Sequence, residues 1–222
     1  MDLSKAKKIL PTPVYTELDK QGIAVLRPAQ EKAMSAGLFD KKNLLVCTPT
    51  ASGKTLVGEM AMINMLSKKE KTIAVYVVPL RALASEKYKS FSKKYPQFKV
   101  TLTSGDMDSD DRYLAEYDLI ITTSEKLDSL IRHHAPWLSM VKCLVVDEIH
   151  LLNDSSRGPT LEILLTILRS QNKDVQIIGL SATIGNPEEL ASWLNAELVV
   201  DTWRPVELKK GVFHEDTIHF EE

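Results

Sequence analysis

The chain has 222 residues, which is the length of one large domain or two small ones. Hydrophobic residues make up 44% of it and charged residues 26%, which excludes disordered, collagen-like and coiled-coil chains. The 28 Lys and Arg residues nearly balance the 30 Asp and Glu residues. The composition therefore excludes an overall basic coat for nucleic acid, although it allows a local basic groove.

Short apolar runs alternate with longer amphipathic segments along the chain. After a helical lead-in over residues 1–27, these runs predict strands at residues 43–47, 72–78, 99–103, 118–122, 142–147 and 175–180, with weaker candidates at 197–200 and 206–213. Helices are predicted between them, at residues 28–36, 54–67, 82–94, 124–134, 160–170 and 187–195.

The inner strand candidates are almost continuously apolar, as residues 73–78 and 144–146 illustrate. Such runs are typical of a parallel sheet that helices cover on both faces. The alternation of strands and helices therefore predicts an α/β fold with three layers and a mostly parallel central sheet. The helical pattern stops near residue 203, so residues 203–222 are predicted to be a linker.

Cysteine content and hydropathy indicate the cellular compartment. Cys47 and Cys143 lie inside apolar runs and cannot form a disulfide framework, which favours a reduced, intracellular protein. No apolar stretch reaches the roughly 18 residues that a membrane helix needs, and the charged residues 1–8 do not resemble a signal peptide. We therefore expect a cytoplasmic protein without a membrane partner.

A candidate phosphate-binding loop follows the first strand and opens the next helix. Its residues are Thr48, Pro49, Thr50, Ala51, Ser52, Gly53, Lys54 and Thr55. Backbone N–H groups of such a loop cradle phosphates, Lys54 would neutralise the β- and γ-phosphates of ATP, and the Thr55 hydroxyl would bind Mg²⁺. Thr48 stands where such loops usually begin with Gly or Ala. The alternative is an ordinary surface turn.

Two adjacent carboxylates end the strand predicted at residues 142–147. Asp147 would hold Mg²⁺, partly through water, and Glu148 would polarise the attacking water as a general base. Ligands of parallel sheets bind at the carboxyl ends of the strands, so this motif and the phosphate loop are expected to open on one crevice. A solvated acidic strand end is the alternative.

Together these motifs resemble those of superfamily 2 helicases of the DExH type. Besides the phosphate loop and Asp147-Glu148-Ile149-His150, the matching residues occur in the order of that family: Gln30, Pro79-Leu80-Arg81, Ser104-Gly105-Asp106, Thr123-Ser124-Glu125-Lys126 and Ser181-Ala182-Thr183.

The resemblance implies a role for each of these segments. Gln30 would read adenine, because a carboxamide both donates and accepts hydrogen bonds. His150 would belong to the catalytic segment, and residues 181–183 would couple hydrolysis to strand movement through hydroxyl contacts with it. Residues 79–81, 104–105 and 123–126 would contact nucleic acid. The alternative is a purely structural role for Ser104, Thr123 and Ser124 as helix-capping residues, which is compatible with phosphate contact.

Longer peptides narrow the resemblance to the Ski-type branch and to its archaeal DNA repair helicases. Residues 147–153, 157–162 and 181–193 resemble the Ski-type branch, and residues 132–137 and 203–206 resemble its archaeal DNA repair helicases. The resemblance implies an ATP- and Mg²⁺-dependent motor that moves 3′ to 5′ on single-stranded or forked DNA near the nucleoid. Residues 28–202 would form its first RecA-like phosphate-loop NTPase domain. A second RecA-like domain, in cis or from another chain, would supply the arginine finger, so slow hydrolysis is expected.

Three alternatives stay open at this point. An RNA helicase of the same branch would use the same backbone contacts, and 2′-hydroxyl contacts would distinguish it. A non-catalytic nucleic-acid-binding or partner-docking module could keep the nucleotide fold. A small-molecule kinase with a phosphate loop would not explain Gln30 or residues 181–183.

Overall fold

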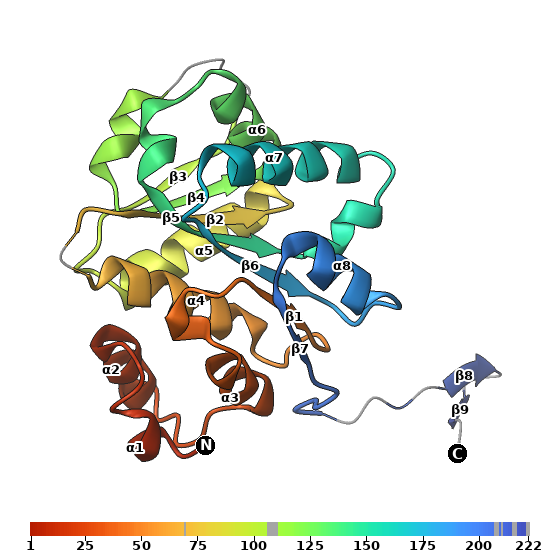
Figure 1. Ribbon diagram of the computed structural model, residues 1–222. Helices are drawn as coiled ribbons and strands as arrows, with labels where there is room; N and C mark the ends of the chain where they lie inside the picture. Colours follow the sequence, from red (N-terminus) through yellow and green to blue (C-terminus); the bar gives the residue numbers. More distant parts are fainter. Residues whose placement is uncertain (69, 106–110, 207–208, 210, 215–216, 221–222) are drawn as a thin grey trace.

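A seven-stranded sheet forms the centre of the molecule, and each neighbouring pair of its strands is parallel. The computed structural model describes residues 1–68, 70–105, 111–206, 209, 211–214 and 217–220. The strand order is β3-β4-β2-β5-β6-β1-β7 (Figure 1). The strands are β1 Leu44–Cys47, β2 Ile73–Val78, β3 Val100–Thr103, β4 Leu119–Thr123, β5 Val141–Asp147, β6 Gln176–Ser181 and β7 Glu197–Val200.

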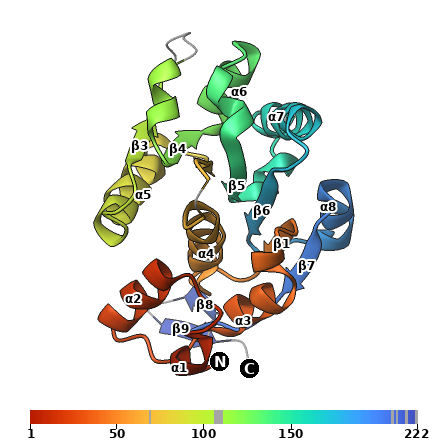
Figure 2. The same ribbon diagram turned by 60° about the vertical axis from the view of Figure 1, so that its left-hand side comes forward.

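Helices cover both faces of this sheet (Figure 2). One face packs against α1 Leu3–Ala6, α2 Thr12–Lys20, α3 Pro28–Ser35, α4 Lys54–Leu66 and α5 Arg81–Lys94. The other face packs against α6 Ser124–Arg132, α7 Gly158–Gln171 and α8 Pro187–Leu194. Short 3₁₀ helices lie at Leu38–Asp40, Arg112–Glu116, Pro136–Met140 and Ile149–Asn153.

Alternating side chains of the strands build two separate hydrophobic cores. In β5, Cys143 and Val145 belong to the core under α4 and α5, whereas Leu144 and Val146 belong to the core under α6 and α7. A strand that is buried on both faces has to be apolar at every position, which explains the continuous runs in the sequence. The predicted three-layer α/β fold is confirmed.

Most predicted elements lie within two residues of those observed, but the last strand differs. The structure has β8 Gly211–His214 in place of a strand at residues 206–213, of which residues 207, 208 and 210 lie outside the described part of the chain. Strand β8 pairs antiparallel with β9 Thr217–Phe220 in a separate hairpin (Figure 1). An alternating apolar segment can pair locally through a turn, and sequence patterning alone does not identify its partner.

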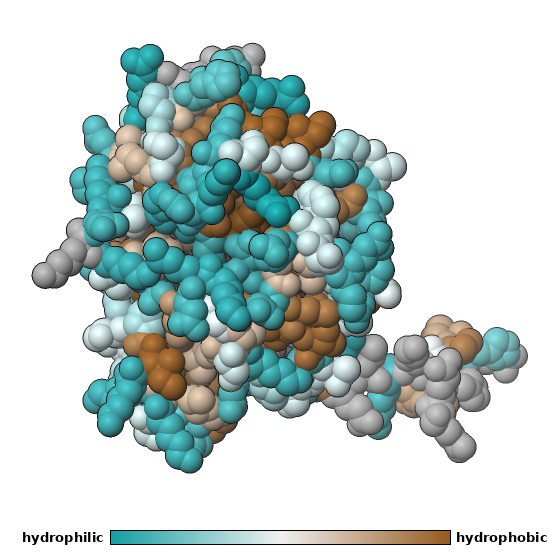
Figure 3. All heavy atoms as spheres, viewed as in Figure 1, coloured by the Kyte–Doolittle hydropathy of each residue, from teal (hydrophilic) through white to brown (hydrophobic). Residues whose placement is uncertain are grey.

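The face seen in Figure 3 is mostly hydrophilic, with separate apolar patches between polar residues. Within the described ranges, no helix has both the length and the apolar character needed to cross a membrane.

Candidate nucleotide and nucleic-acid site

The candidate phosphate loop joins β1 to α4 at the carboxyl edge of the sheet. Its backbone turns through Ala51, with φ of 62°, and Gly53, with φ of 96°. The φ of Gly53 favours glycine, and a Cβ atom there would lie 2.5 Å from Gln30 Nε2 and would push the Gln30 amide aside. The loop therefore has the strand–turn–helix geometry that the sequence predicts.

Lys54 places its ammonium group at the centre of this loop. Its Nζ donates to the carbonyl oxygens of Thr48 at 3.0 Å and Pro49 at 3.3 Å. Burial lowers the pKa of Lys54, whereas the charges of Glu148 and Asp147 act in the opposite direction. The side chain can supply a buried positive charge to a phosphate group at the start of α4.

Thr48, which departs from the usual loop sequence, braces the loop. Its Oγ1 lies 2.7 Å from Ser52 Oγ, and its backbone N–H donates to the carbonyl oxygen of Ser181 at 3.2 Å. Thr48 and Ser52 are both buried. Glycine or alanine at position 48 would lack this hydroxyl contact. Threonine at this position therefore adds a hydrogen bond that connects residues 48 and 52 of the loop.

Gln30 and Arg27 hold the loop from the side of α3. The backbone N–H of Arg27 donates to Gln30 Oε1 at 2.8 Å, and Gln30 Nε2 donates to the Gly53 carbonyl oxygen at 3.2 Å. The Arg27 guanidinium donates to the Ala51 carbonyl and lies 5.3 Å from the centre of the Trp203 ring. A carboxamide has two donor hydrogens and two acceptor lone pairs, so Gln30 keeps one of each for a ligand.

The two carboxylates at the end of β5 have different surroundings. Asp147 Oδ2 accepts a hydrogen bond from Tyr76 Oη at 2.8 Å, and only 12% of the Asp147 side chain is exposed. Burial, followed by the charge of Asp147, raises the pKa of Tyr76 well above its usual value, so Tyr76 stays a donor. The Glu148 side chain is more exposed than that of Asp147, and the Glu148 backbone is left-handed, with φ of 55°. Its Oε2 atom lies 3.3 Å from Nδ1 of His150.

Residues 181–183 contact the acidic segment through the main chain. The Ala182 N–H donates to His150 Nδ1 at 3.4 Å, whereas the Ser181 hydroxyl donates to the Ala182 carbonyl oxygen at 2.8 Å. Thr183 is exposed. The contact observed between these segments uses a backbone amide, and the Ser181 hydroxyl is bonded locally to the Ala182 carbonyl. The hydroxyl contacts expected of residues 181–183 stay a prediction.

Thr55 and Asp147, the expected magnesium ligands, lie within reach of a single cation. The ammonium of Lys87, from α5, lies 3.2 Å from Thr55 Oγ1 and 3.8 Å from Asp147 Oδ2. A hydroxyl and a carboxylate are the oxygen ligands that Mg²⁺ prefers, and it usually takes further oxygens from phosphate and water. Across the described residues, no group of three or more His, Cys, Asp and Glu is placed to hold a metal.

Sequence reasoning missed Lys87, Tyr76 and Arg27. The positions of Ala84, Lys87 and Phe91 follow the i, i+3, i+7 spacing of one helix face, and Ala84 and Phe91 are buried. A lysine on a buried helix face, or a tyrosine inside an apolar strand such as β2, needs a polar partner. This signal could have identified two of the three residues.

The candidate nucleic-acid residues lie at the carboxyl ends of β2, β3 and β4. These residues are Pro79, Leu80, Arg81, Ser104, Gly105, Thr123, Ser124 and Lys126. The order β3-β4-β2-β5 places them along the edge that continues to the acidic strand end (Figure 1). Asp106 lies outside the described residues.

These residues differ in how much side chain they present. Leu80 and Arg81 are exposed, whereas Thr123, Ser124 and Lys126 are buried. Thr123 Oγ1 accepts from the Lys126 N–H at 3.4 Å as a helix cap, and Lys126 Nζ lies 2.9 Å from Asp111 Oδ2. The Lys126 charge is therefore used inside the domain, and contact with a ligand here depends on the main chain.

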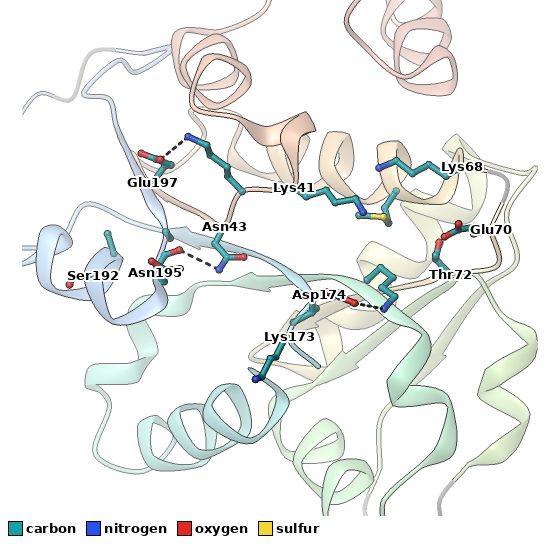
Figure 4. A pocket seen from close by; sticks show the side chains of 16 residues that line it. Lys41, Asn43, Lys68, Glu70, Thr72, Lys173, Asp174, Ser192, Asn195 and Glu197 are labelled. Carbon is teal, nitrogen blue, oxygen red and sulfur yellow. Dashed lines mark hydrogen bonds and ion pairs between the residues drawn. The ribbon is translucent and has the colours of Figure 1, made fainter. Parts of the chain in front are cut away.

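Two cavities differ in their relation to these residues. One of about 660 Å³ adjoins the phosphate loop and is lined by Arg27, Gln30, Gly53, Thr55 and Lys87 among others. A larger one of about 920 Å³ lies at the amino-terminal edge of the sheet, where the lining includes exposed lysines and the ion pair of Lys42 with Glu197 (Figure 4). The candidate chemistry adjoins the smaller cavity, and the lysines of the larger one are solvated.

The fold and the site define a class of protein. A phosphate loop, an acidic strand end and the segment 181–183 meet at one edge of a parallel sheet, as in a phosphate-loop NTPase domain. The sequence pattern of the DEAD/DEAH box helicase family matches residues 27–190, and the chain belongs to this family.

Curated relatives are similar over most of this chain. The ATP-dependent DNA helicase Hel308 of Methanocaldococcus jannaschii is 59% identical over 206 residues, which cover 90% of this chain and 17% of that protein. Hel308 of Pyrococcus horikoshii is 51% identical over 207 residues, which cover 92% of this chain and 28% of that protein. The chain thus spans less than a third of the length of these relatives.

Solved helicase structures have the same fold. The Mycobacterium smegmatis helicase Lhr, bound to single-stranded DNA and AMP-PNP, matches with a TM-score of 0.72 at 29% identity, over 89% of this chain and 28% of that one. The helicase MrfA, bound to DNA and AMPPNP, matches with a TM-score of 0.71 at 27% identity, over 87% and 29% of the two chains.

Proposed function

We propose that this chain is the ATP-binding motor domain of a longer DNA helicase that moves 3′ to 5′ on single-stranded or forked DNA. The observation that supports this most is the shared edge: the phosphate loop, Asp147-Glu148 and residues 181–183 adjoin the carboxyl ends of β2, β3 and β4. The Hel308 relatives and the DNA-bound neighbours favour DNA over RNA. Work on DNA would place the protein at the nucleoid, in the cytoplasm.

The nucleotide side of this proposal assigns one role to each group. Lys54 and the backbone of residues 48–53 would bind the β- and γ-phosphates, and Gln30 would bind the adenine edge. Thr55 and Asp147 would hold Mg²⁺, which neutralises phosphate charge when bound. Glu148 would orient the attacking water and accept its proton, and its side chain is more exposed than that of Asp147.

His150 would carry the state of the nucleotide to residues 181–183. The supporting observation is that His150 Nδ1 lies 3.3 Å from Glu148 Oε2 and 3.4 Å from the backbone nitrogen of Ala182. One ring nitrogen either donates to the carboxylate or accepts from the amide, so only one of these two hydrogen bonds forms at a time. A change in the position of Glu148 during hydrolysis would alter this pair of contacts. The nucleic-acid side would use Arg81 and the backbone of residues 79–81, 104–105 and 123–126 to bind phosphates without reading bases.

Efficient hydrolysis is expected to need a second RecA-like domain, in cis or from another chain. In related phosphate-transfer enzymes an arginine finger raises the rate by about 10³–10⁵. Under this proposal residues 28–202 form the first motor domain, residues 1–27 support it, and residues 203–222 begin the connection to the second.

The first test is ATP turnover by the purified chain with and without single-stranded DNA, together with ATP binding. We expect ATP to bind and turnover to stay slow, with the Glu148→Gln variant binding ATP but losing the residual turnover. Fast, DNA-stimulated turnover by the monomer would contradict the need for a second domain. No ATP binding by the wild-type chain would contradict the proposed function itself.

A second test compares DNA and RNA of equal sequence at the same salt concentration. Because backbone contacts discriminate weakly between the two, we expect similar affinities for the isolated domain, with DNA favoured at most severalfold. A strong preference for RNA would identify 2′-hydroxyl contacts and would support an RNA helicase of the same branch.

A further inference from the structure

Lys87 is a partly buried cation that contacts both groups proposed to hold Mg²⁺. Only 14% of its side chain is exposed, and Nζ lies 3.2 Å from Thr55 Oγ1 and 3.8 Å from Asp147 Oδ2. The ammonium also lies 5.8 Å from the ring centre of Tyr76, whose hydroxyl donates to the same Asp147 oxygen. One lysine thus joins the phosphate-loop helix, the acidic strand and β2.

We propose that Lys87 is a positioning residue that competes with the divalent cation for Thr55 and Asp147, and thereby links metal binding to helix α5. The inference rests on the proposed function, because that function makes these two groups the metal ligands. An ammonium and a divalent cation within a few ångströms repel each other, and the low exposure of the site weakens screening by solvent. Binding of the metal therefore displaces the Lys87 ammonium.

Helix α5 connects this competition to the nucleic-acid side. The helix begins at Arg81, six residues before Lys87, which is about 9 Å along a helix axis. Phe91 of the same helix packs edge-on against Tyr76 of β2, with ring centres 5.3 Å apart. A displaced Lys87 side chain releases α5, which begins at Arg81, from Asp147 at the end of β5.

The proposal predicts opposite effects of Lys87 with and without metal. The positive charge near the phosphate loop attracts nucleotide when no metal is present, and it opposes the metal when Mg²⁺ is added. Removal of the charge should therefore weaken metal-free binding of nucleotide and lower the Mg²⁺ concentration that half-saturates the complex. A side chain that only packs against Tyr76 would not produce this pair of opposite changes.

The experiment titrates Mg²⁺ into the chain with fluorescent ADP and reads binding, not turnover. We compare Lys87→Met with Lys89→Met, which removes the same charge from an exposed position on the same helix. We expect Lys87→Met to lower the half-saturating Mg²⁺ concentration about tenfold, as the loss of one hydrogen bond to a charged group predicts, and to weaken ADP binding in EDTA. Lys89→Met should change neither value.

Two further variants keep the test decisive. Lys87→Gln keeps a donor for Thr55 without the charge, so it should also lower the half-saturating Mg²⁺ concentration and can replace Lys87→Met if that variant does not fold. Lys87→Arg keeps the charge and should stay close to wild type. An unchanged or higher Mg²⁺ requirement in the neutral variants would overturn the inference. Absence of Mg²⁺-dependent ADP binding in the wild-type chain would instead overturn the proposed function.

Discussion

The two halves of the carboxyl edge of the sheet use their polar side chains differently. Around β1, β5 and β6, hydrogen bonds hold the candidate nucleotide residues in place: Lys54 donates to the loop carbonyls, Gln30 donates to Gly53, and Asp147 accepts from Tyr76 of the neighbouring β2. Around β2, β3 and β4, Arg81 is exposed, whereas the Lys126 ammonium is paired with Asp111 inside the domain.

This difference teaches which groups can act on a ligand. In the nucleotide half, hydrogen bonds already hold the charged side chains in place, as binding of a small ligand of fixed shape would require under the proposed function. The nucleic-acid half presents mainly strand ends and helix starts, whose backbone N–H groups suit a repeating phosphate backbone. A charged residue in a nucleic-acid motif can therefore serve the fold, and substitutions can separate the two uses.

The largest expected effect concerns the ion pair of Lys126 with Asp111. Both side chains are largely buried, so Lys126→Met removes the ammonium that lies 2.9 Å from a largely buried carboxylate and should lower the free energy of unfolding by about 3 kcal/mol. Urea denaturation of the purified variant measures this loss. A variant as stable as wild type would show that the pair contributes little to the fold.

The same variant tests whether the Lys126 charge reaches nucleic acid. Each phosphate contact with a single strand adds about 0.7 to the slope of log affinity against log salt concentration. We expect Lys126→Met to keep the wild-type slope under conditions where it is folded, and Arg81→Ala to reduce it by about 0.7. A reduced slope for Lys126→Met would place its ammonium on a phosphate and would remove the contrast between the halves.

Lys54→Ala should have the next largest effect, confined to the nucleotide half. The substitution removes a buried positive charge from the loop, and we expect ADP to bind about 30-fold more weakly, or about 2 kcal/mol. Fluorescent ADP titration measures the change, with single-stranded DNA affinity in the absence of nucleotide as the control. Equal ADP affinity would exclude Lys54 as a phosphate ligand.

Sequence patterns predicted where the segments of the nucleotide half lie in the fold, because the signals of these segments are local. Residues 48–55 combine a strand end, a tight turn and a helix start within eight positions, and Asp147 directly follows an apolar strand. Each motif could be placed at the same sheet edge from the α/β alternation alone. The bracing role of Thr48 could not, because it depends on Ser52 and Ser181 approaching in space.

Long-range packing explains what sequence patterns did not predict. Lys87 contacts Thr55 and Asp147 only because α5 packs beside α4 and β5, and Lys126 is buried only because Asp111 comes beside α6. A lysine at position 87 or 126 indicates a possible ion pair, but its partner lies on another helix, strand or loop, which the local sequence does not identify. The same dependence on tertiary pairing explains the hairpin β8-β9.

The smallest expected effect, that of Tyr76→Phe, tests the strand that the two halves share. Strand β2 carries Tyr76 under the nucleotide site and leads directly into residues 79–81. Loss of the hydroxyl removes a hydrogen bond to a largely buried carboxylate, so we expect a cost of about 1.5 kcal/mol and a melting temperature about 4 °C lower. The control Tyr88→Phe, at an exposed position of α5, should leave the melting temperature unchanged.

The same Tyr76→Phe variant also tests ligand binding. Because the lost contact faces Asp147, Mg²⁺-dependent ADP binding should weaken while DNA binding without nucleotide stays constant. A parallel loss of DNA binding would show that the halves are coupled through β2 itself and not through α5.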